Sequence, residues 1–210
     1  MTYYTAIELI TFLVLGIMMI LVQENDRIRS EQKRQFYETY TIIILASLAE
    51  WLSIVLNGAP SWTISIHKLV KCLDYMLTPT AAMMFVRQVM KGSKTDRIMT
   101  YLIYANAVLQ LVSLFTGWTF TVDDSNFYHH GPLHFSYIAI YLVSVLLVMI
   151  GFLMYGRQFR NKNRVSLSSI IAMIFLSNAN QEISPYDIRI VYLALAIGSI
   201  LMFVYFNEFF

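Results

Sequence analysis

The chain has 210 residues, of which 58% are hydrophobic and 13% charged, with a net charge of +2 and a mean hydropathy of +0.59. A soluble domain carries about 25% charged residues, so this composition indicates a membrane protein rather than a soluble domain. The small net charge argues against a nucleic-acid partner, and the single cysteine excludes an internal disulfide.

Seven apolar segments are long enough to cross a bilayer, which requires roughly 20 mostly apolar residues in a helix. In chain order the predicted spans are Thr5–Gln23, Phe36–Leu56, Thr63–Met90, Arg97–Trp118, Pro132–Tyr155, Val165–Glu182 and Pro185–Phe206. The apolar runs are continuous, whereas the strands of an outer-membrane barrel alternate polar and apolar residues. We therefore predict an all-α fold, a single seven-transmembrane-helix bundle over residues 1–210.

Basic residues gather in three alternate connectors of this bundle. These connectors hold 12 of the 15 Lys and Arg residues, namely Arg27, Arg29, Lys33, Arg34, Arg87, Lys91, Lys94, Arg97, Arg157, Arg160, Lys162 and Arg164. Cytoplasmic loops of membrane proteins carry an excess of Lys and Arg. The pattern predicts a multi-pass protein of a cell (inner) membrane with its N-terminus outside and its C-terminus inside.

The outer connector between the fourth and fifth spans, "FTGWTFTVDDSNFYHHGPLHF", is polar and aromatic. Pro132 suits the first turn of the fifth helix, because the missing N–H of proline is not needed there. The segment has two interpretations: an aromatic anchor at the membrane interface, or a lid or side wall over a ligand site. The lid would be formed by Asp124, Asn126, Tyr128, His129 and His130.

Polar and ionisable residues inside the spans gather in the outer halves of the helices, and the inner halves are hydrocarbon and methionine. Each ionisable group in a bilayer costs several kcal/mol unless it is paired or faces a cavity. An outward-open cavity explains the pattern, and internal ion pairs such as Glu50 with Lys71 and Glu182 with Arg189 are the alternative. The predicted ligand-binding residues are Glu50, Lys71, Asp74, Asn106, Gln110, Tyr137, Tyr141, Asn178, Gln181, Arg189 and Tyr192.

Several chemistries are disfavoured by the residues themselves. His129, His130 and His134 are possible zinc ligands, but Gly131-Pro132 interrupts their helical spacing, and we predict no metal site. No nucleophile–base set, phosphate loop or catalytic carboxylate pair stands out, so we predict neither an enzyme nor a cofactor. A retinal protein requires a lysine in the last span, which is absent here.

The seven-helix topology, the basic cytoplasmic loops and one outer-loop motif together resemble a known group. The outer-loop residues that carry the resemblance are Asp124, Asn126, Phe127, Tyr128, His129, Gly131 and Pro132, together with the segment "NANQEISP" near the end of the sixth span. On these features the chain is similar to the seven-helix N-terminal sensor regions of bacterial histidine kinases and GGDEF diguanylate cyclases. The resemblance implies a ligand sensor without specifying the ligand.

We therefore expect a sensory domain that binds a small extracellular or periplasmic molecule in an outward-facing pocket. The seventh helix would relay the change to a cytoplasmic signalling domain in cis beyond residue 210, in a homodimer embedded in the lipid bilayer. The alternative is a small-solute transporter, although the chain shows no internal repeat of the kind that transporters usually contain.

Overall fold

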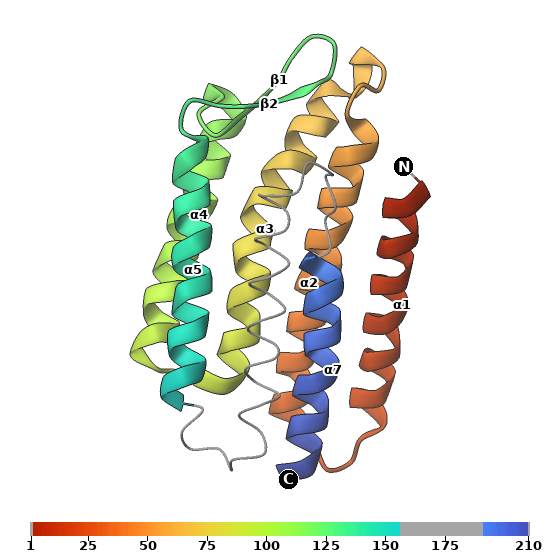
Figure 1. The fold of residues 1–210 in the computed structure, drawn as a ribbon, viewed down its shortest axis with the longest axis vertical. Helices are drawn as coiled ribbons and strands as arrows, with labels where there is room; N and C mark the ends of the chain where they lie inside the picture. The colour runs from red at the N-terminus through yellow and green to blue at the C-terminus, as the bar shows by residue number, and fades with distance from the viewer. Residues whose placement is uncertain (1, 156–190, 210) are drawn as a thin grey trace.

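The computed structural model describes residues 2–155 and 191–209, which form a helical bundle closed at one end by a β-hairpin (Figure 1). The described elements are α1 (Thr2–Glu24), α2 (Ser30–Leu56), the 3-10 turn η1 (Ser61–Thr63), α3 (Ile64–Met90), α4 (Lys94–Thr116), β1 (Phe120–Val122), β2 (Tyr128–His130), α5 (His134–Tyr155) and α7 (Val191–Phe209). The predicted helical architecture is confirmed for these residues. The predicted sixth span, residues 165–182, lies outside them.

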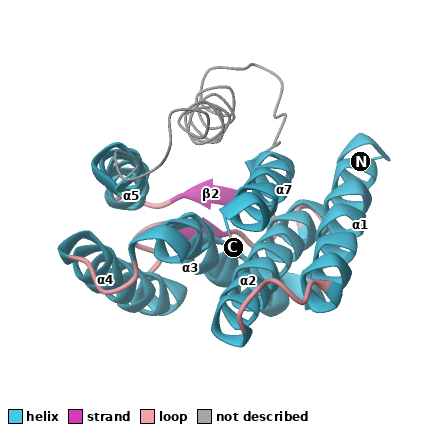
Figure 2. Cartoon of the chain, turned by 90° about the horizontal axis from the view of Figure 1, so that it is seen from below, coloured by secondary structure: helices cyan, strands magenta, loops and turns pink. Residues whose placement is uncertain are grey.

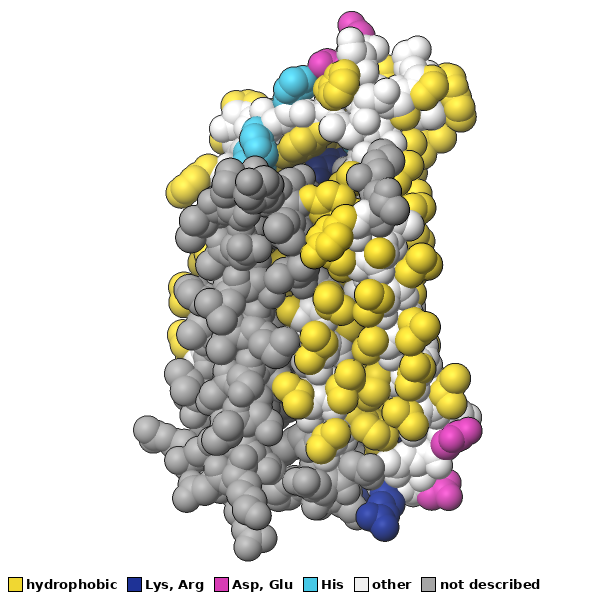
Figure 3. Space-filling model, turned by 45° about the vertical axis from the view of Figure 1, so that its right-hand side comes forward, with side chains coloured by type: hydrophobic (Ala, Val, Ile, Leu, Met, Phe, Trp, Pro, Cys, Tyr) yellow, Lys and Arg dark blue, Asp and Glu magenta, His cyan; other side chains and the backbone are white. Residues whose placement is uncertain are grey.

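Three described helices, α1, α2 and α4, are long and apolar enough to cross a membrane. Shorter apolar stretches cover His134–Leu147 in α5 and Val191–Val204 in α7. Hydrophobic side chains line the described part of the face shown in Figure 3, between the polar ends of the molecule. These features suit a multi-pass membrane protein, whose lipid-facing surface must be apolar.

The helix ends differ from the predicted boundaries for local reasons. Helix α2 begins at Ser30, six residues before the predicted start, because the polar residues that follow favour a helix. Helix α4 ends at Thr116, since Gly117 adopts φ 72° and donates its N–H to the Ser113 carbonyl at 2.8 Å. The expectation that Pro132 starts the fifth helix is wrong by two residues, because Pro132 belongs to a turn that precedes His134.

Helix α3 lies at the centre of one half of the bundle, in contact with α2, α4 and α5, while α1 contacts α2 and α7 (Figure 2). Much of the core in the half away from the hairpin is hydrocarbon, methionine and aromatic. Its fully buried members include Val22, Phe36, Tyr40, Ile43, Met99 and Met202. Buried polar side chains such as Lys71, Asp74 and Gln110 lie in the other half, nearer the hairpin.

The outer connector was predicted as an aromatic anchor or a lid, and the structure adds that it contains a β-hairpin. β1 and β2 pair antiparallel, with Phe120 opposite His130 and Val122 opposite Tyr128. The carboxylate of Asp123 accepts the N–H groups of Ser125 and Phe127 at 2.9 Å each, which closes the turn between the strands. The connector is thus an ordered cap on the bundle.

Candidate functional site

A buried ion pair lies on the face of α3 that points into the bundle, below the hairpin. The Lys71 ammonium donates to the Asp74 carboxylate at 2.7 Å, and the two residues are 3% and 4% exposed. Taking two charges out of water is expensive unless further polar contacts compensate. The pair lies within one helix, so the attraction between these two residues does not join α3 to another helix.

Two aromatic rings flank the Lys71 ammonium. Its nitrogen lies 4.7 Å from the ring centroids of both Tyr75 and Tyr128, which come from α3 and β2 respectively. A cation over the face of an aromatic ring is attracted by about 0.5–2 kcal/mol, with the larger values in desolvated sites. The ammonium is therefore held by one carboxylate and two rings, and the hairpin supplies one of those rings.

The aromatic cluster continues onto α5. Tyr75 stacks on Tyr137 with ring centroids 4.1 Å apart, and Tyr137 stacks on Tyr141 at 6.4 Å. The hydroxyls of Tyr75 and Tyr128 are hydrogen-bonded to each other, and Tyr128 also bonds to His130 Nδ1 at 2.7 Å. Predicted residues from α3, β2 and α5 thus meet at one place, together with Tyr75, which the sequence analysis missed.

A hydrogen-bonded route leads from this cluster to α7. The Thr78 hydroxyl donates to the Asp74 backbone carbonyl at 2.8 Å and bonds to the Tyr192 hydroxyl at 2.7 Å. It also lies 3.3 Å from the Asp74 carboxylate. Lys71, Asp74 and Thr78 repeat at i, i+3 and i+7, so they share one face of α3. The Thr78 hydroxyl thus lies between Asp74 of α3 and the Tyr192 hydroxyl of α7.

Asn106 and Gln110 serve packing between α3 and α4. Pro79 has no N–H, so it leaves the carbonyl of Tyr75 without its helical partner. The Asn106 amide donates to that carbonyl at 2.9 Å, and Gln110 in turn donates to Asn106 Oδ1 at 3.1 Å. Gln110 Oε1 also accepts the Thr119 hydroxyl at 2.7 Å. These contacts link the proline position of α3 to the base of the hairpin.

Asn126 anchors the hairpin to the connector between α2 and α3. Its side chain is fully buried, and its amide nitrogen lies within 3.0 Å of three acceptors: the Leu56 and Ala59 carbonyls and the Thr63 hydroxyl. Its Oδ1 lies 2.9 Å from His67 Nδ1, and its backbone φ is 63°, a conformation that asparagine tolerates. The hairpin is consequently fastened over the bundle.

The remaining lid residues lie on the exposed side of the hairpin. His129 Nε2 bonds to Asp123 Oδ2 at 2.9 Å, and Asp124 is exposed. The pKa of Asp123 lies below its ordinary value of 3.8, first because the Phe127 N–H stabilises the carboxylate and then because His129 and Ser125 do so. The rings of His130 and His134 are in contact in a tilted arrangement, with centroids 3.9 Å apart and an interplanar angle of 41°. Figure 3 shows the hairpin histidines and acidic side chains gathered at this end.

The remaining predicted ligand-binding residues are either buried in the bundle or lie outside the described residues. Glu50 on α2 and Tyr192 on α7 are buried, at 7% and 4% exposure. Asn178, Gln181 and Arg189, together with the suggested Glu182–Arg189 pair, lie outside the described residues. Across the described part of the chain, no group of three or more His, Cys, Asp or Glu side chains has an arrangement that would hold a metal ion.

Comparison with known proteins identifies a family. Residues 7–209 match the family described as the N-terminal 7TM region of histidine kinase. No curated protein and no solved structure matches the chain.

The family match supports the histidine-kinase part of the resemblance noted from the sequence, while a diguanylate-cyclase output stays a prediction. A region of this kind is the membrane-embedded sensor part of a kinase and is not itself catalytic. The chain belongs to the family of N-terminal seven-transmembrane regions of histidine kinases.

Proposed function

We propose that this sensor region binds a small polar molecule from the outer side of the membrane, next to Lys71 and Asp74. The observation that carries the proposal is the buried Lys71–Asp74 pair between the rings of Tyr75 and Tyr128. Ionisable groups at membrane depth are costly, and they mark functional sites more often than packing sites. The hairpin lies over the Lys71–Asp74 pair, and the hydrogen bonds of Asn126 hold it there.

The proposal includes seven spans with the N-terminus outside. In Figure 1 the connectors 25–29 and 91–93 lie at the end of the bundle that carries the C-terminus, and the hairpin lies at the other end. The sequence places eight basic and five acidic residues in 24–38 and 87–97, around those two connectors. The positive-inside rule therefore favours a cytoplasmic location for that end and an outer location for the hairpin.

The ligand would carry an anionic group and a hydrogen-bonding or cationic group. An anionic group would compete with Asp74 for the Lys71 ammonium, and the released carboxylate would accept a donor from the ligand. Tyr137 and Tyr141 from α5 and Glu50 from α2 would complete the contacts, with Asn178, Gln181 and Arg189 as further predicted contributors. Asn106 and Gln110 are assigned to packing in this proposal, since their side chains contact α3 and Thr119.

The signal would leave through α7. Moving the Asp74 carboxylate changes the contacts of Thr78, whose hydroxyl bonds to Tyr192 on α7. A ligand shifts such an equilibrium only by its differential affinity for the two arrangements. Helix α7 would then carry the altered packing toward a cytoplasmic signalling domain.

The binding step is tested by thermal unfolding of the protein in nanodiscs with a panel of amino acids, carboxylic acids and amines. At least one compound is expected to raise the midpoint for the wild type, and Lys71→Gln should abolish that rise. Lys68→Gln is the matched control, because Lys68 lies one turn earlier on α3 and is only partly buried. If Lys71→Gln keeps the full response, the site is wrong.

The relay step is tested separately by hydrogen exchange of the α7 amides, with and without the compound identified above. Wild type should show changed exchange in α7 on binding. Tyr192→Phe should still bind, with a similar midpoint shift, but should lose the change in α7. An unchanged response of α7 in Tyr192→Phe would exclude the Thr78–Tyr192 route while leaving the binding site intact.

A further inference from the structure

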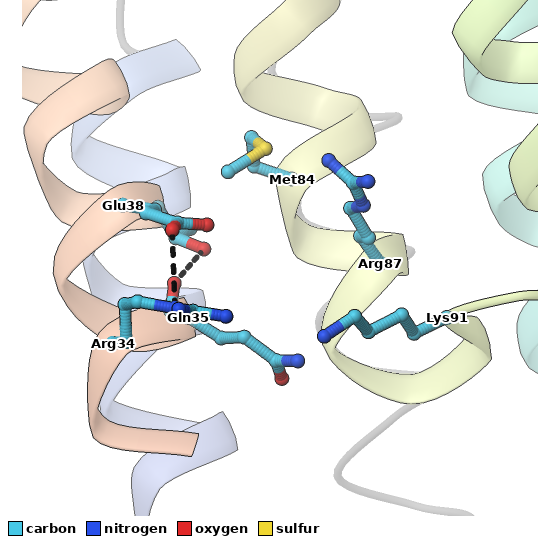
Figure 4. Close-up of a pocket in the computed structure, with 7 residues that line it drawn as sticks. Arg34, Gln35, Glu38, Met84, Arg87 and Lys91 are labelled. Atoms are coloured by element: carbon cyan, nitrogen blue, oxygen red, sulfur yellow. Dashed lines mark hydrogen bonds and ion pairs between the residues drawn. The ribbon is translucent and has the colours of Figure 1, made fainter. Parts of the chain in front are cut away.

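A second polar site lies at the opposite end of the bundle, between α2 and α3. It is a pocket with a cavity volume of about 220 Å³. Arg34, Gln35 and Glu38 of α2 face Met84 and Arg87 of α3 and the adjacent Lys91 across it (Figure 4). Thr39 completes the lining. Drug-sized ligands occupy about 300–1,000 Å³, so this pocket suits a smaller group.

Two of the three cations of the pocket, Arg34 and Arg87, are loosely paired, and the third forms an exposed ion pair. Arg34 lies 3.6 Å from Glu38 and Arg87 lies 3.7 Å from Asp96, both beyond hydrogen-bonding distance for these atoms. Lys91 contacts Glu31 at 2.7 Å, but both side chains are about half exposed. Exposed ion pairs contribute little, about 0–1 kcal/mol, so a competing anion can redirect these side chains.

Arg87 also has an unused donor. Its Nε is shielded from solvent and has no hydrogen-bond partner within the described residues. The nearest carboxylate oxygen is Asp96 Oδ1, 3.7 Å away, which is likewise buried without a hydrogen-bond partner. A buried donor without a partner costs about 1–3 kcal/mol. Arginine binds phosphate oxygens in a fork geometry, and such charge-assisted hydrogen bonds are stronger than neutral ones. An incoming phosphate oxygen would satisfy this donor.

We propose that the pocket binds the phosphate of an anionic membrane-lipid headgroup. The inference uses the orientation given under Proposed function, which places the pocket at the cytoplasmic surface. Anionic lipids are enriched in the cytoplasmic leaflet, and basic pockets between helices on that side recognise their headgroups. Arg34 from α2 and Arg87 with Lys91 from the end of α3 would hold the phosphate jointly, so the lipid would tie the inner ends of these two helices together. Met84 gives the pocket an apolar wall.

The test is native mass spectrometry of the protein released from nanodiscs of phosphatidylcholine with an equal fraction of phosphatidylglycerol. Wild type should retain phosphatidylglycerol in preference to phosphatidylcholine. Arg87→Gln and Lys91→Gln should each lower that retention about fivefold or more, because each removes a charge-assisted hydrogen bond to the phosphate. Lys94→Gln removes the same charge at the same end outside the pocket, and it should change retention less than twofold.

Thermal unfolding in pure phosphatidylcholine nanodiscs checks that the variants fold. Should Arg87→Gln unfold early there, Arg34→Gln replaces it, because the Arg34 side chain is 67% exposed. Equal losses for Lys94→Gln and the pocket variants would overturn the proposal, since they would indicate a diffuse surface attraction. The proposal would also be overturned if millimolar inorganic phosphate raised the unfolding midpoint as much as phosphatidylglycerol does. That result would indicate that the pocket binds a soluble anion. Failure here leaves the outer ligand site untouched, because the two sites lie at opposite ends of the bundle.

Discussion

At the scale of single residues, a proline explains a polar side chain inside the membrane. Pro79 lies within α3, and the carbonyl that it leaves unpaired belongs to Tyr75, four residues earlier. The side-chain amide of Asn106 on α4 donates a hydrogen bond to this carbonyl oxygen at 2.9 Å. Neighbouring helices commonly satisfy backbone groups freed by proline in membranes. Asn106 was predicted from the sequence as a ligand-binding residue, and in the structure its amide donates to a backbone carbonyl of another helix.

The hydrogen bond from Asn106 to the Tyr75 carbonyl predicts that substitutions at positions 79 and 106 are energetically coupled in a double-mutant cycle. Asn106→Leu should lower the free energy of unfolding by about 1–3 kcal/mol, because the buried Tyr75 carbonyl loses its donor. Pro79→Ala restores an N–H at position 79, which can donate to the same carbonyl. In the Pro79→Ala background, Asn106→Leu should therefore cost at least about 0.5 kcal/mol less than in wild type. Reversible unfolding in detergent measures both values, and strict additivity would contradict the account.

The turn of the hairpin predicts a pH dependence with a definite sign. The pKa of Asp123 is lowered below 3.8 in the folded state, so its hydrogen bonds stabilise the turn above the unfolded pKa. That stability is lost as the pH falls through the folded pKa. After correction for intrinsic exchange rates, the Ser125 and Phe127 amides should be equally protected against hydrogen exchange from pH 7 down to about 4. Below that pH their protection should decrease. Asp123→Asn should remove this acid transition, and a transition retained in that variant would assign it to another group.

At the scale of elements, the hairpin depends on a close backbone approach at its base. Gly131 donates its N–H to the Thr119 carbonyl at 3.0 Å, and Leu133 donates to the Trp118 carbonyl at 2.7 Å. A Cβ atom on Gly131 would lie 2.4 Å from the carbonyl oxygens of Gly117 and Trp118. Those oxygens belong to the backbone and cannot rotate away as side-chain ends do. The strands therefore require glycine here to turn into α5.

Gly131→Ala should accordingly destabilise the protein by about 1–3 kcal/mol, the usual range for overpacking a tight site. Gly16→Ala provides the matched control, since nothing lies within 4 Å of its added Cβ in the middle of α1. That control should be neutral or stabilising, because alanine favours a helix over glycine by up to about 1 kcal/mol. Thermal unfolding of both variants compares them directly, and similar midpoints would refute the steric argument.

The same scale shows which elements the sequence predicts well. Long apolar runs predicted the ends of α3 to within one residue and those of α1 to within three, because hydrophobic length is a local property of the chain. The three-residue strands were missed, since Phe120 to Val122 is too short for a convincing alternation. A signal was nevertheless present: Asp123, Ser125 and Asn126 are turn formers between two aromatic-rich stretches.

At the scale of the whole molecule, the orientation in the membrane is open to a direct test. Cys72 is 1% exposed, and Cys72→Ala gives a cysteine-free background. Ser125→Cys at the hairpin tip should react with a membrane-impermeant maleimide in intact cells. Asp26→Cys, which keeps the basic residues of its connector, should react only after permeabilisation. The reverse labelling pattern would invert the proposed topology and would move the lipid pocket to the outer surface.

The sequence by itself determined the membrane class, the predicted positions of the helices and the uneven distribution of charge, because composition, hydrophobic length and basic loops are properties of contiguous segments. Only the tertiary structure decided which polar groups meet. Lys71 is held by a carboxylate one turn away and by a ring from β2, and Asn126 contacts Leu56, Thr63 and His67 across a long stretch of chain. A buried polar group must find partners in the membrane, but its identity does not specify them. The folded arrangement of the helices and the hairpin supplies those partners.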